Sequence, residues 1–232
     1  RRRPPAHRAV KPPREFYDRP TLDVARDLLG LVLVHNRRGV VTSGVIVEVE
    51  AYIGESDPAC HAAPGPTRRN EPLYGTPGHA YVYLNYGIHC LVNVVTESHG
   101  SPAAVLIRAL DPLDGIGVMR RRRARAMKGR RRIADSASLP VTDLCRGPGN
   151  LTMAMGITLA DNRLDLLGDR LYVDDRGIAV GELAWGPRIG IRVGTESPWR
   201  AWVRGHPAVS AQKWSGKALA ERSADATRRT LG

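Results

Sequence analysis

The chain has 232 residues, 42% of them hydrophobic and 25% charged, as is ordinary for a globular protein with one sizeable core. It has no apolar run near the roughly 20 residues that cross a bilayer, and no apolar core follows its first arginines, which argues against a spanning helix or a signal peptide. The net charge of +12 at pH 7 predicts a polyanionic partner and no membrane partner.

The three cysteines point to a reducing compartment. Cys60, Cys90 and Cys145 are odd in number, lie far apart and form no Cys-x-x-Cys pair, so we expect reduced thiols rather than a disulfide framework or a zinc knuckle. We therefore expect an intracellular protein, cytoplasmic and nucleoid-associated in a bacterium or nuclear in a eukaryote.

The chain opens with RRRPPAHRAVKPPREFYDRP, which is rich in Arg and Pro and poor in aliphatic residues. Such a composition predicts a basic flexible arm over residues 1–18. The next segment, TLDVARDLLG, predicts a helix with Thr21 as its N-cap that ends at Gly30. LVLVH and VVTSGVIVEVEAYIG then predict two strands, joined into a hairpin by a turn at residues 36–39.

The later elements complete a mixed pattern. AYVYLNYGIHCLVNVV and PAAVLIRAL predict further strands, residues 112–132 a helix with a basic end, and LTMAMGI a helix after GPGN. RLYVDD and RIGIRVG predict two late strands. Strands in adjacent runs with helices inserted later indicate a single α+β domain rather than repeated βαβ units. Without an internal repeat or a linker, we assign this domain to residues 19–215 and a C-terminal tail to residues 216–232.

The strand VIVEVEAYIG carries two carboxylates. A period of two places Val45, Val47, Val49 and Ala51 on one face, and on the other the residues Ile46, Glu48, Glu50 and Tyr52. Taken alone, this stretch is explained by a half-exposed antiparallel strand with solvated glutamates. The rest of the chain gives the carboxylates another interpretation.

A long loop rich in Gly and Pro follows this strand and holds His61, Arg68, Arg69 and Asn70. Long loops inside compact domains are usually functional or disordered. The histidines and cysteines near it match no metal-ligand spacing, so no metal site is predicted.

The stretch YVYLNYG concentrates tyrosines. Alternation puts Tyr81 and Tyr83 on one face of a strand, and Asn85-Tyr86-Gly87 predicts a turn with Tyr86 at the tip of a hairpin. Cross-strand aromatic packing is one explanation for these residues. In so basic a protein, an exposed aromatic side chain at a turn can instead stack on nucleic-acid bases or wedge between them.

Several blocks in order resemble the alkyladenine (3-methyladenine) DNA glycosylases. The resemblance covers roughly Leu22 to Ser210 and rests on ARDLLGLVLV, GVIVEVEAYIGESDPACHA, TRRNEPLYGTPGHAYVYLNYGIHCLVNVV, AVLIRALDPLDG, LCRGPGNLTMAMGI and PWRAWVRGHPAVS. It implies a curved antiparallel sheet surrounded by helices, with a protruding β-hairpin. It also implies an enzyme that flips alkylated or deaminated purines out of duplex DNA and hydrolyses the N-glycosidic bond with an activated water, without a covalent intermediate or a lyase step.

The resemblance also implies roles for individual residues. Glu50 matches the general base, Arg108 an arginine that helps to hold the water, and Val203 a backbone carbonyl that binds the same water. Tyr86 matches the residue pushed into the duplex in place of the flipped nucleotide. The residues that match the base pocket are Tyr52, His61, Tyr83, Asn93 and Leu106.

The chemistry agrees with these residue types. Cleavage of an N-glycosidic bond develops oxocarbenium character at the sugar, which one carboxylate can stabilise while it takes a proton from water. Aromatic rings attract a cationic alkylated purine more than a neutral base. We expect a monomer that acts without a cofactor on double-stranded DNA containing damaged purines.

Arg68, Arg69, Arg120 and Arg121 are the predicted contacts to the DNA backbone, although a solvated helix face explains the basic run RRRRARAMKGRRR equally well. Two other functions are open. A non-catalytic nucleic-acid-binding module would use the basic residues and tyrosines but not Glu50. An enzyme for free nucleosides would not need a broad basic surface.

Overall fold

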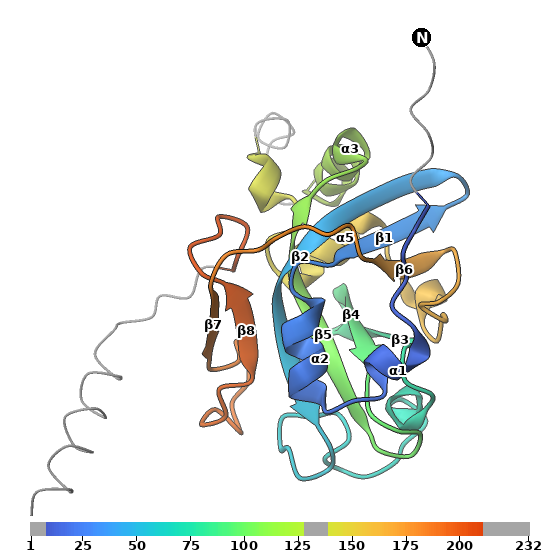
Figure 1. Ribbon diagram of the computed structural model, residues 1–232, viewed down its shortest axis with the longest axis vertical. Helices are drawn as coiled ribbons and strands as arrows, with labels where there is room; N and C mark the ends of the chain where they lie inside the picture. The colour runs from blue at the N-terminus through green and yellow to red at the C-terminus, as the bar shows by residue number, and fades with distance from the viewer. Residues whose placement is uncertain (1–7, 128–138, 211–232) are drawn as a thin grey trace, which may run out of the picture.

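The computed structural model describes residues 8–127 and 139–210, which form a curled antiparallel sheet with helices packed against it (Figure 1). The strands are β1 Val32–Arg37, β2 Val40–Ile53, β3 Ala80–Asn85, β4 His89–Val95, β5 Ala103–Pro112, β6 Leu171–Asp174, β7 Leu183–Gly186 and β8 Arg200–Val203. Their order is β3-β4-β5-β2-β1-β6, with β8 paired to both β2 and β7. The expected single α+β domain with a curved sheet is confirmed.

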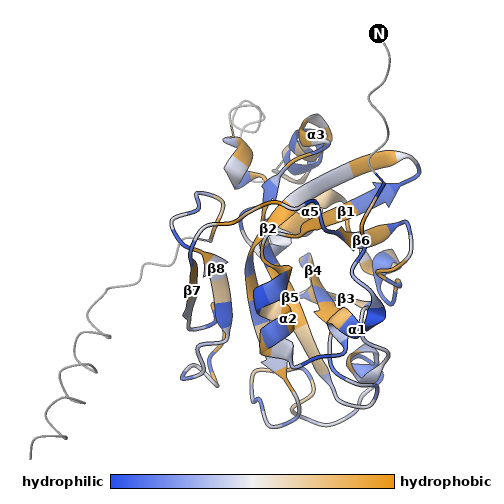
Figure 2. Ribbon diagram, viewed as in Figure 1, coloured by the Kyte–Doolittle hydropathy of each residue, from blue (hydrophilic) through white to orange (hydrophobic). Residues whose placement is uncertain are grey.

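Within residues 8–127 and 139–210, four α-helices accompany the sheet: α1 Arg14–Tyr17, α2 Thr21–Leu28, α3 Ile116–Met127 and α5 Pro148–Met155. Short 3-10 helices occupy η1 Glu71–Tyr74, η2 Val141–Asp143 and η3 Leu159–Asp161. In Figure 2, α2 turns hydrophilic residues toward the viewer, while its Val24, Ala25 and Leu28 are buried in the core. Within the described ranges, no helix is long and apolar enough to span a bilayer.

The largest core cluster lies on one face of the sheet and the functional site on the other. Alternate residues of the central strands, such as Val49, Val92 and Ile107, pack in this cluster together with residues of α2 and α5. Because side chains alternate along a strand, the residues between them point to the opposite face. That face carries the two smaller apolar clusters and the polar groups described below.

An irregularity in β2 changes the alternation expected for VIVEVEAYIG. The pairing of β2 with β5 shifts register between Ile46 and Glu48 and again between Glu48 and Val49. Ile46 therefore packs in the same core cluster as Val49, and not on the face of Glu48 and Glu50 as predicted. Such bulges occur frequently beside active sites. The prediction was right that both glutamates leave the core, but neither is solvated, since both are fully buried.

The arm expected over residues 1–18 differs from the structure at residues 8–18. Val10 donates its N–H to Asp174 at 2.8 Å, and the Lys11 ammonium donates to the carbonyl of Gly168 at 2.7 Å. Tyr17 is fully buried at the end of α1, against Gly78. The segment is fixed by partners more than 60 residues away in the sequence, which local composition does not reveal. Residues 1–7 and the expected tail at 216–232 lie outside the described residues.

The other elements mostly follow the sequence. The β1–β2 hairpin turns at Arg38 and Gly39, both at positive φ, and the β3–β4 hairpin turns at Tyr86 and Gly87. Thr21 is the first residue of α2 rather than its N-cap, which is Pro20. The helix expected at residues 112–132 corresponds to α3, which begins only at Ile116. Residues 128–132 of the expected helix lie outside the described residues. Helix α5 already begins at Pro148, inside GPGN.

One predicted strand is wrong. RIGIRVG, residues 188–194, forms a loop between β7 and β8, two strands that the sequence did not predict. Its apolar residues alternate as they do in a strand. However, the backbone N–H of Ile189 and the side chain of Arg188 form hydrogen bonds with β2 and with the loop that follows β2.

Candidate active site

The floor of the site is built by one face of four adjacent strands. Register places Glu50 and Asn93 on either side of Leu106, and Tyr52 beside Ala104. Tyr81 lies next to Asn93 on the other side. Because residues two apart share a face, these side chains project together from the face opposite the main core. The fold thus brings to one place residues as distant in the sequence as Glu50 and Leu106.

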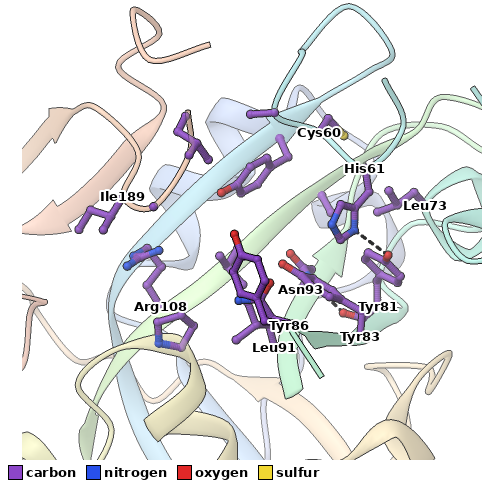
Figure 3. A pocket seen from close by; sticks show the side chains of 18 residues that line it. Cys60, His61, Leu73, Tyr81, Tyr83, Tyr86, Leu91, Asn93, Arg108 and Ile189 are labelled. Carbon is purple, nitrogen blue, oxygen red and sulfur yellow. Dashed lines mark hydrogen bonds between the residues drawn. The ribbon is translucent and has the colours of Figure 1, made fainter. Parts of the chain in front are cut away.

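A cavity of about 360 Å³ opens above this floor (Figure 3). This volume lies within the range of small-molecule and cofactor sites, about 300–1,000 Å³. Its walls come from β2–β5, from the loop before η1, from the β3–β4 turn, and from the loop 187–194. Of the residues predicted for the base pocket, all five line it: Tyr52, His61, Tyr83, Asn93 and Leu106.

Glu50 lies directly behind this wall with its carboxylate fully buried. Its Oε1 accepts the backbone N–H of Ile189 at 2.6 Å. Its Oε2 accepts the Tyr52 hydroxyl at 2.8 Å and pairs with Nη1 of Arg108 at 3.1 Å. A carboxylate offers about four acceptor positions, and the two hydrogen bonds leave some of them open. Ile189, Tyr52 and Arg108 all line the cavity, so Glu50 is separated from it by a single layer of groups.

Arg108 joins two buried carboxylates. Its Nε donates to Glu48 Oε1 at 3.2 Å, and its Nη1 contacts Glu50. Burial alone would lower the pKa of the Arg108 guanidinium, but the charges of Glu50 and Glu48 outweigh it and raise that pKa. Arg108 is therefore a permanent cation. Among the described residues, none accepts a hydrogen bond from its Nη2, so this group is available at the cavity wall.

Glu48 is a functional candidate that the sequence reading left without a role. It is fully buried, its Oε1 also accepts Nε of Arg200 at 2.7 Å, and its Oε2 accepts the N–H of Ser210 at 2.8 Å. Arg200 belongs to β8, which pairs with β2 at this point. The carboxylates and guanidiniums alternate in the order Glu50, Arg108, Glu48, Arg200, which balances the buried charges. The alternation of charged and apolar residues in VIVEVE was the available signal.

An aromatic wall stands opposite Arg108. Tyr81 and Tyr83 stack with ring centroids 5.3 Å apart, and His61 meets Tyr83 edge to face at 4.5 Å. The Tyr81 hydroxyl and Nδ1 of His61 share a hydrogen bond of 2.8 Å (Figure 3). Burial, aided by the charge of Arg69, lowers the pKa of His61, so the imidazole is neutral at pH 7. Burial also raises the pKa of Tyr81 to about 12, which keeps its hydroxyl protonated.

The two residues predicted at the edge of the base have different chemistry. Asn93 is almost fully buried and donates from Nδ2 to the carbonyl of Tyr81 at 2.9 Å. This bond orients the amide on the cavity floor. Leu106 is its apolar neighbour on β5. Together they give the floor one oriented polar group beside an apolar surface.

Tyr86 lies at the tip of the β3–β4 hairpin, as predicted. Its side chain is 85% exposed, and its backbone is left-handed with φ 48°. Leu84 and Ile88 on the same tip are also exposed. Tyr86 also borders the cavity mouth. The aromatic packing proposed as an alternative does not describe Tyr86, although it does describe Tyr81 and Tyr83.

The predicted DNA-backbone arginines differ in their surroundings. Arg68 and Arg69 are exposed beside the cavity, and the guanidinium of Arg69 lies 5.9 Å from the Tyr83 ring centroid. Arg121 is exposed on α3, but Arg120 is half-buried and donates to the carbonyl of Leu139 at 2.5 Å. Part of the basic run therefore binds carbonyl groups of the protein itself.

Val203 is not brought to the carboxylate. It lies on β8, three residues beyond Arg200, the strand partner of Glu50. Its side chain packs in the cluster with Val45 and Val47, and its carbonyl accepts the N–H of His206. The backbone beside Glu50 is that of Ile189, which the sequence reading placed in a strand. No signal local to residues 187–194 indicates this contact.

Comparison with known proteins gives a consistent result. A profile described as methylpurine-DNA glycosylase matches residues 15–207. A protein from Methanocella arvoryzae is 47% identical over 202 residues, which cover 85% of this chain and 94% of the relative. A protein from Clostridium acetobutylicum is 43% identical, and the match covers 86% of this chain and 97% of the relative. A protein from Rubrobacter xylanophilus is 47% identical, and the match covers 83% of this chain and 94% of the relative. Each carries the name "Putative 3-methyladenine DNA glycosylase".

Proposed function

The chain belongs to the methylpurine-DNA glycosylase family, whose members are DNA glycosylases for alkylated bases, and we propose that it rotates a damaged purine out of duplex DNA and hydrolyses its bond to the sugar. It acts as a monomer, without a cofactor, and leaves an abasic site in an uncut strand. The observation that carries this proposal is a buried carboxylate, Glu50, paired with Arg108 one layer behind a cavity suited to a base.

Glu50 is the proposed general base. The Ile189 N–H and the Tyr52 hydroxyl fill two of its about four acceptor positions and Arg108 forms an ion pair with Oε2, so a position remains that can accept a proton from one water molecule. The available Nη2 of Arg108 can hold the oxygen of that water. As the water oxygen bonds to C1′ of the sugar, the bond from C1′ to the purine nitrogen breaks, the purine leaves with the bonding electrons, and the proton passes to Glu50. The negative charge of the carboxylate also stabilises the oxocarbenium character of the sugar.

Aromatic side chains are proposed to select the base. Tyr52, His61 and Tyr83 approach the cavity from different elements and offer ring faces and edges to a planar ligand. A neutral His61 adds no charge that would repel a cationic alkylated purine. Since a ring face attracts a cation by about 0.5–2 kcal/mol, an alkylated purine gains over a normal base.

Tyr86 is proposed to fill the gap that the flipped nucleotide leaves. Its exposed ring forms an apolar tip together with the exposed Leu84 and Ile88, and it lies at the mouth of the cavity that would receive the base. One hairpin thus supplies a wall of the pocket through Tyr83 and a wedge through Tyr86. Arg68 and Arg69 lie beside this mouth, where they would meet the phosphates.

A non-catalytic binding module is the competing function. Burying the carboxylates of Glu48 and Glu50 requires two arginines to balance them, and buried ion pairs contribute little to stability by themselves. A protein that only binds a polyanion gains nothing from negative charge behind its binding cavity. The arrangement of Glu50 therefore favours hydrolysis.

A panel of duplex oligonucleotides tests the proposal. Each duplex carries one lesion, either 3-methyladenine, 7-methylguanine, hypoxanthine or ethenoadenine, and the controls are the undamaged duplex and the corresponding free nucleosides. We expect release of at least one of the modified purines from duplex DNA, an alkali-sensitive but uncut strand, and no release from nucleosides. Binding of every duplex without release of any base would support the binding module instead.

A further inference from the structure

Arg188 is a buried arginine behind the site that the proposed mechanism does not use. Its side chain is fully buried and forms a two-pronged ion pair with Asp57, with Nη1–Oδ2 and Nη2–Oδ1 distances of 2.6 and 2.8 Å. Its guanidinium also donates to the carbonyls of Ala51 at 3.0 Å and Gly194 at 3.2 Å. Arg188 does not line the cavity, so it cannot contact the base directly.

These contacts join three parts of the chain that form the site. Ala51 belongs to β2, between Glu50 and Tyr52. Asp57 organises the loop after β2 by accepting the N–H groups of Ile53 at 3.2 Å and Ala59 at 3.0 Å, two residues before His61. Gly194 ends the loop 187–194, which holds Ile189 and Ile191 at the cavity wall.

Both hydrogen-bond donors to Glu50 lie next to this arginine. Ile189, the next residue along the chain, gives its N–H to Oε1 at 2.6 Å. The Tyr52 ring, whose hydroxyl donates to Oε2 at 2.8 Å, lies with its centroid 4.7 Å from the Arg188 guanidinium. The ring of Trp199 lies 5.0 Å from the guanidinium, so the arginine is held between aromatic groups as well as by Asp57.

We propose that Arg188, locked by Asp57, is a positioning residue for the catalytic carboxylate: it fixes the Ile189 amide and the Tyr52 hydroxyl on Glu50. This inference rests on the proposed glycosylase function. Arginine suits the role because its planar fork can bind a carboxylate and two carbonyls at once, whereas lysine offers a single point charge. The residue would thus control the basicity and orientation of Glu50 without touching substrate.

The proposed role has a signature in the split between binding and chemistry. Arg188 does not line the cavity, so its replacement should leave the affinity for lesion duplex unchanged while single-turnover excision slows. A loss of folded protein would instead lower binding and excision in proportion.

Three variants test the proposal: Arg188→Lys, Asp57→Asn, and the double variant. Arg176→Lys is the control, because Arg176 also forms ion pairs with carboxylates, those of Asp174 and Asp114, but does so at β6, on the far edge of the sheet from β3. The measurements are single-turnover excision at saturating enzyme, affinity for lesion duplex, and melting temperature.

We expect each single variant to slow excision at pH 7 by roughly ten- to a hundredfold, the effect of losing a hydrogen bond to a charged group. Affinity should stay within threefold of the parent, and the double variant should be no slower than the slower single variant, since both changes break one link. If Arg188→Lys does not fold, Asp57→Asn decides alone.

Excision rates like that of the parent in a folded variant would overturn the inference while leaving the glycosylase function intact. A rate that falls only in proportion to folded protein, as in the control, would do the same. A parent protein that releases no base from any duplex would instead refute the proposed function.

Discussion

Replacing Tyr86 by alanine distinguishes between two roles of its ring, insertion into the DNA duplex and packing within the protein. In the free protein this ring is 85% exposed at the tip of the β3–β4 hairpin. Alanine keeps the Cβ, so the left-handed backbone at φ 48° is no more strained than before. The variant therefore removes the ring and little else.

The two interpretations of Tyr86 differ in expected magnitude. A side chain so exposed buries on the order of 30 Å², since a buried tyrosine covers about 200 Å². At about 25 cal/mol per Å², the free energy of unfolding falls by roughly 0.8 kcal/mol and the melting temperature by about 2–3 °C. Base–aromatic stacking is worth about 1–3 kcal/mol, so the equilibrium for the flipped state should fall by about 5- to 160-fold.

A fluorescent base analogue beside the lesion reports the flipped state, and a thermal melt of the same preparation reports stability. Tyr86→Phe should behave like the parent because it keeps the ring. Val40→Ala, at the exposed turn of the β1–β2 hairpin, is the control for losing an apolar side chain at a turn. A parent-like flipping signal from stable Tyr86→Ala protein would refute the wedge, and a loss of about 3–5 kcal/mol of stability would show a packing role.

Other predictions follow from the charges around Glu50 and from the basic surface. Tyr52→Phe removes one hydrogen-bond donor from the carboxylate and should slow single-turnover excision about tenfold; excision at the parental rate would contradict the assigned hydrogen bond. Glu48→Gln removes one of the two carboxylates that orient Arg108 and should also slow excision about tenfold; a parental rate would show that this ion pair does not support excision. Affinity for undamaged duplex should fall steeply with added salt, and Arg121→Ala should reduce the slope by about 1 on a log–log plot, whereas an unchanged slope would remove Arg121 from the phosphate contacts.

Local sequence patterns, namely strand alternation and turn residues, predicted much of the site. The period of two placed Tyr81 with Tyr83 and Glu48 with Glu50, and Asn-Tyr-Gly identified the tip of a hairpin. These features depend on a few neighbouring residues, so they can be recognised locally. The resemblance to a family then assigned roles that alternation alone does not give.

The features that the sequence did not predict depend on distant partners. Residues 188–194 alternate like a strand, but Arg188 pairs with Asp57 and Ile189 binds Glu50, both more than 130 positions away. The register shift at Glu48 likewise depends on how β2 meets β5 and β8 together. Lys11 and Arg14 look like part of a loose arm until their partners Asp169 and Asp165 are known. In each case the missing information is tertiary contact.

The central claim is that Glu50 activates the water. Glu50→Gln keeps the shape of the side chain but cannot take the proton, and Glu182→Gln, an exposed glutamate paired with Arg204, is the matched control. We predict that single-turnover release of the base falls by about 100- to 10,000-fold in Glu50→Gln, as for loss of a general base, with lesion-duplex affinity near that of the parent. Release within threefold of the parent by a folded Glu50→Gln protein would contradict the account.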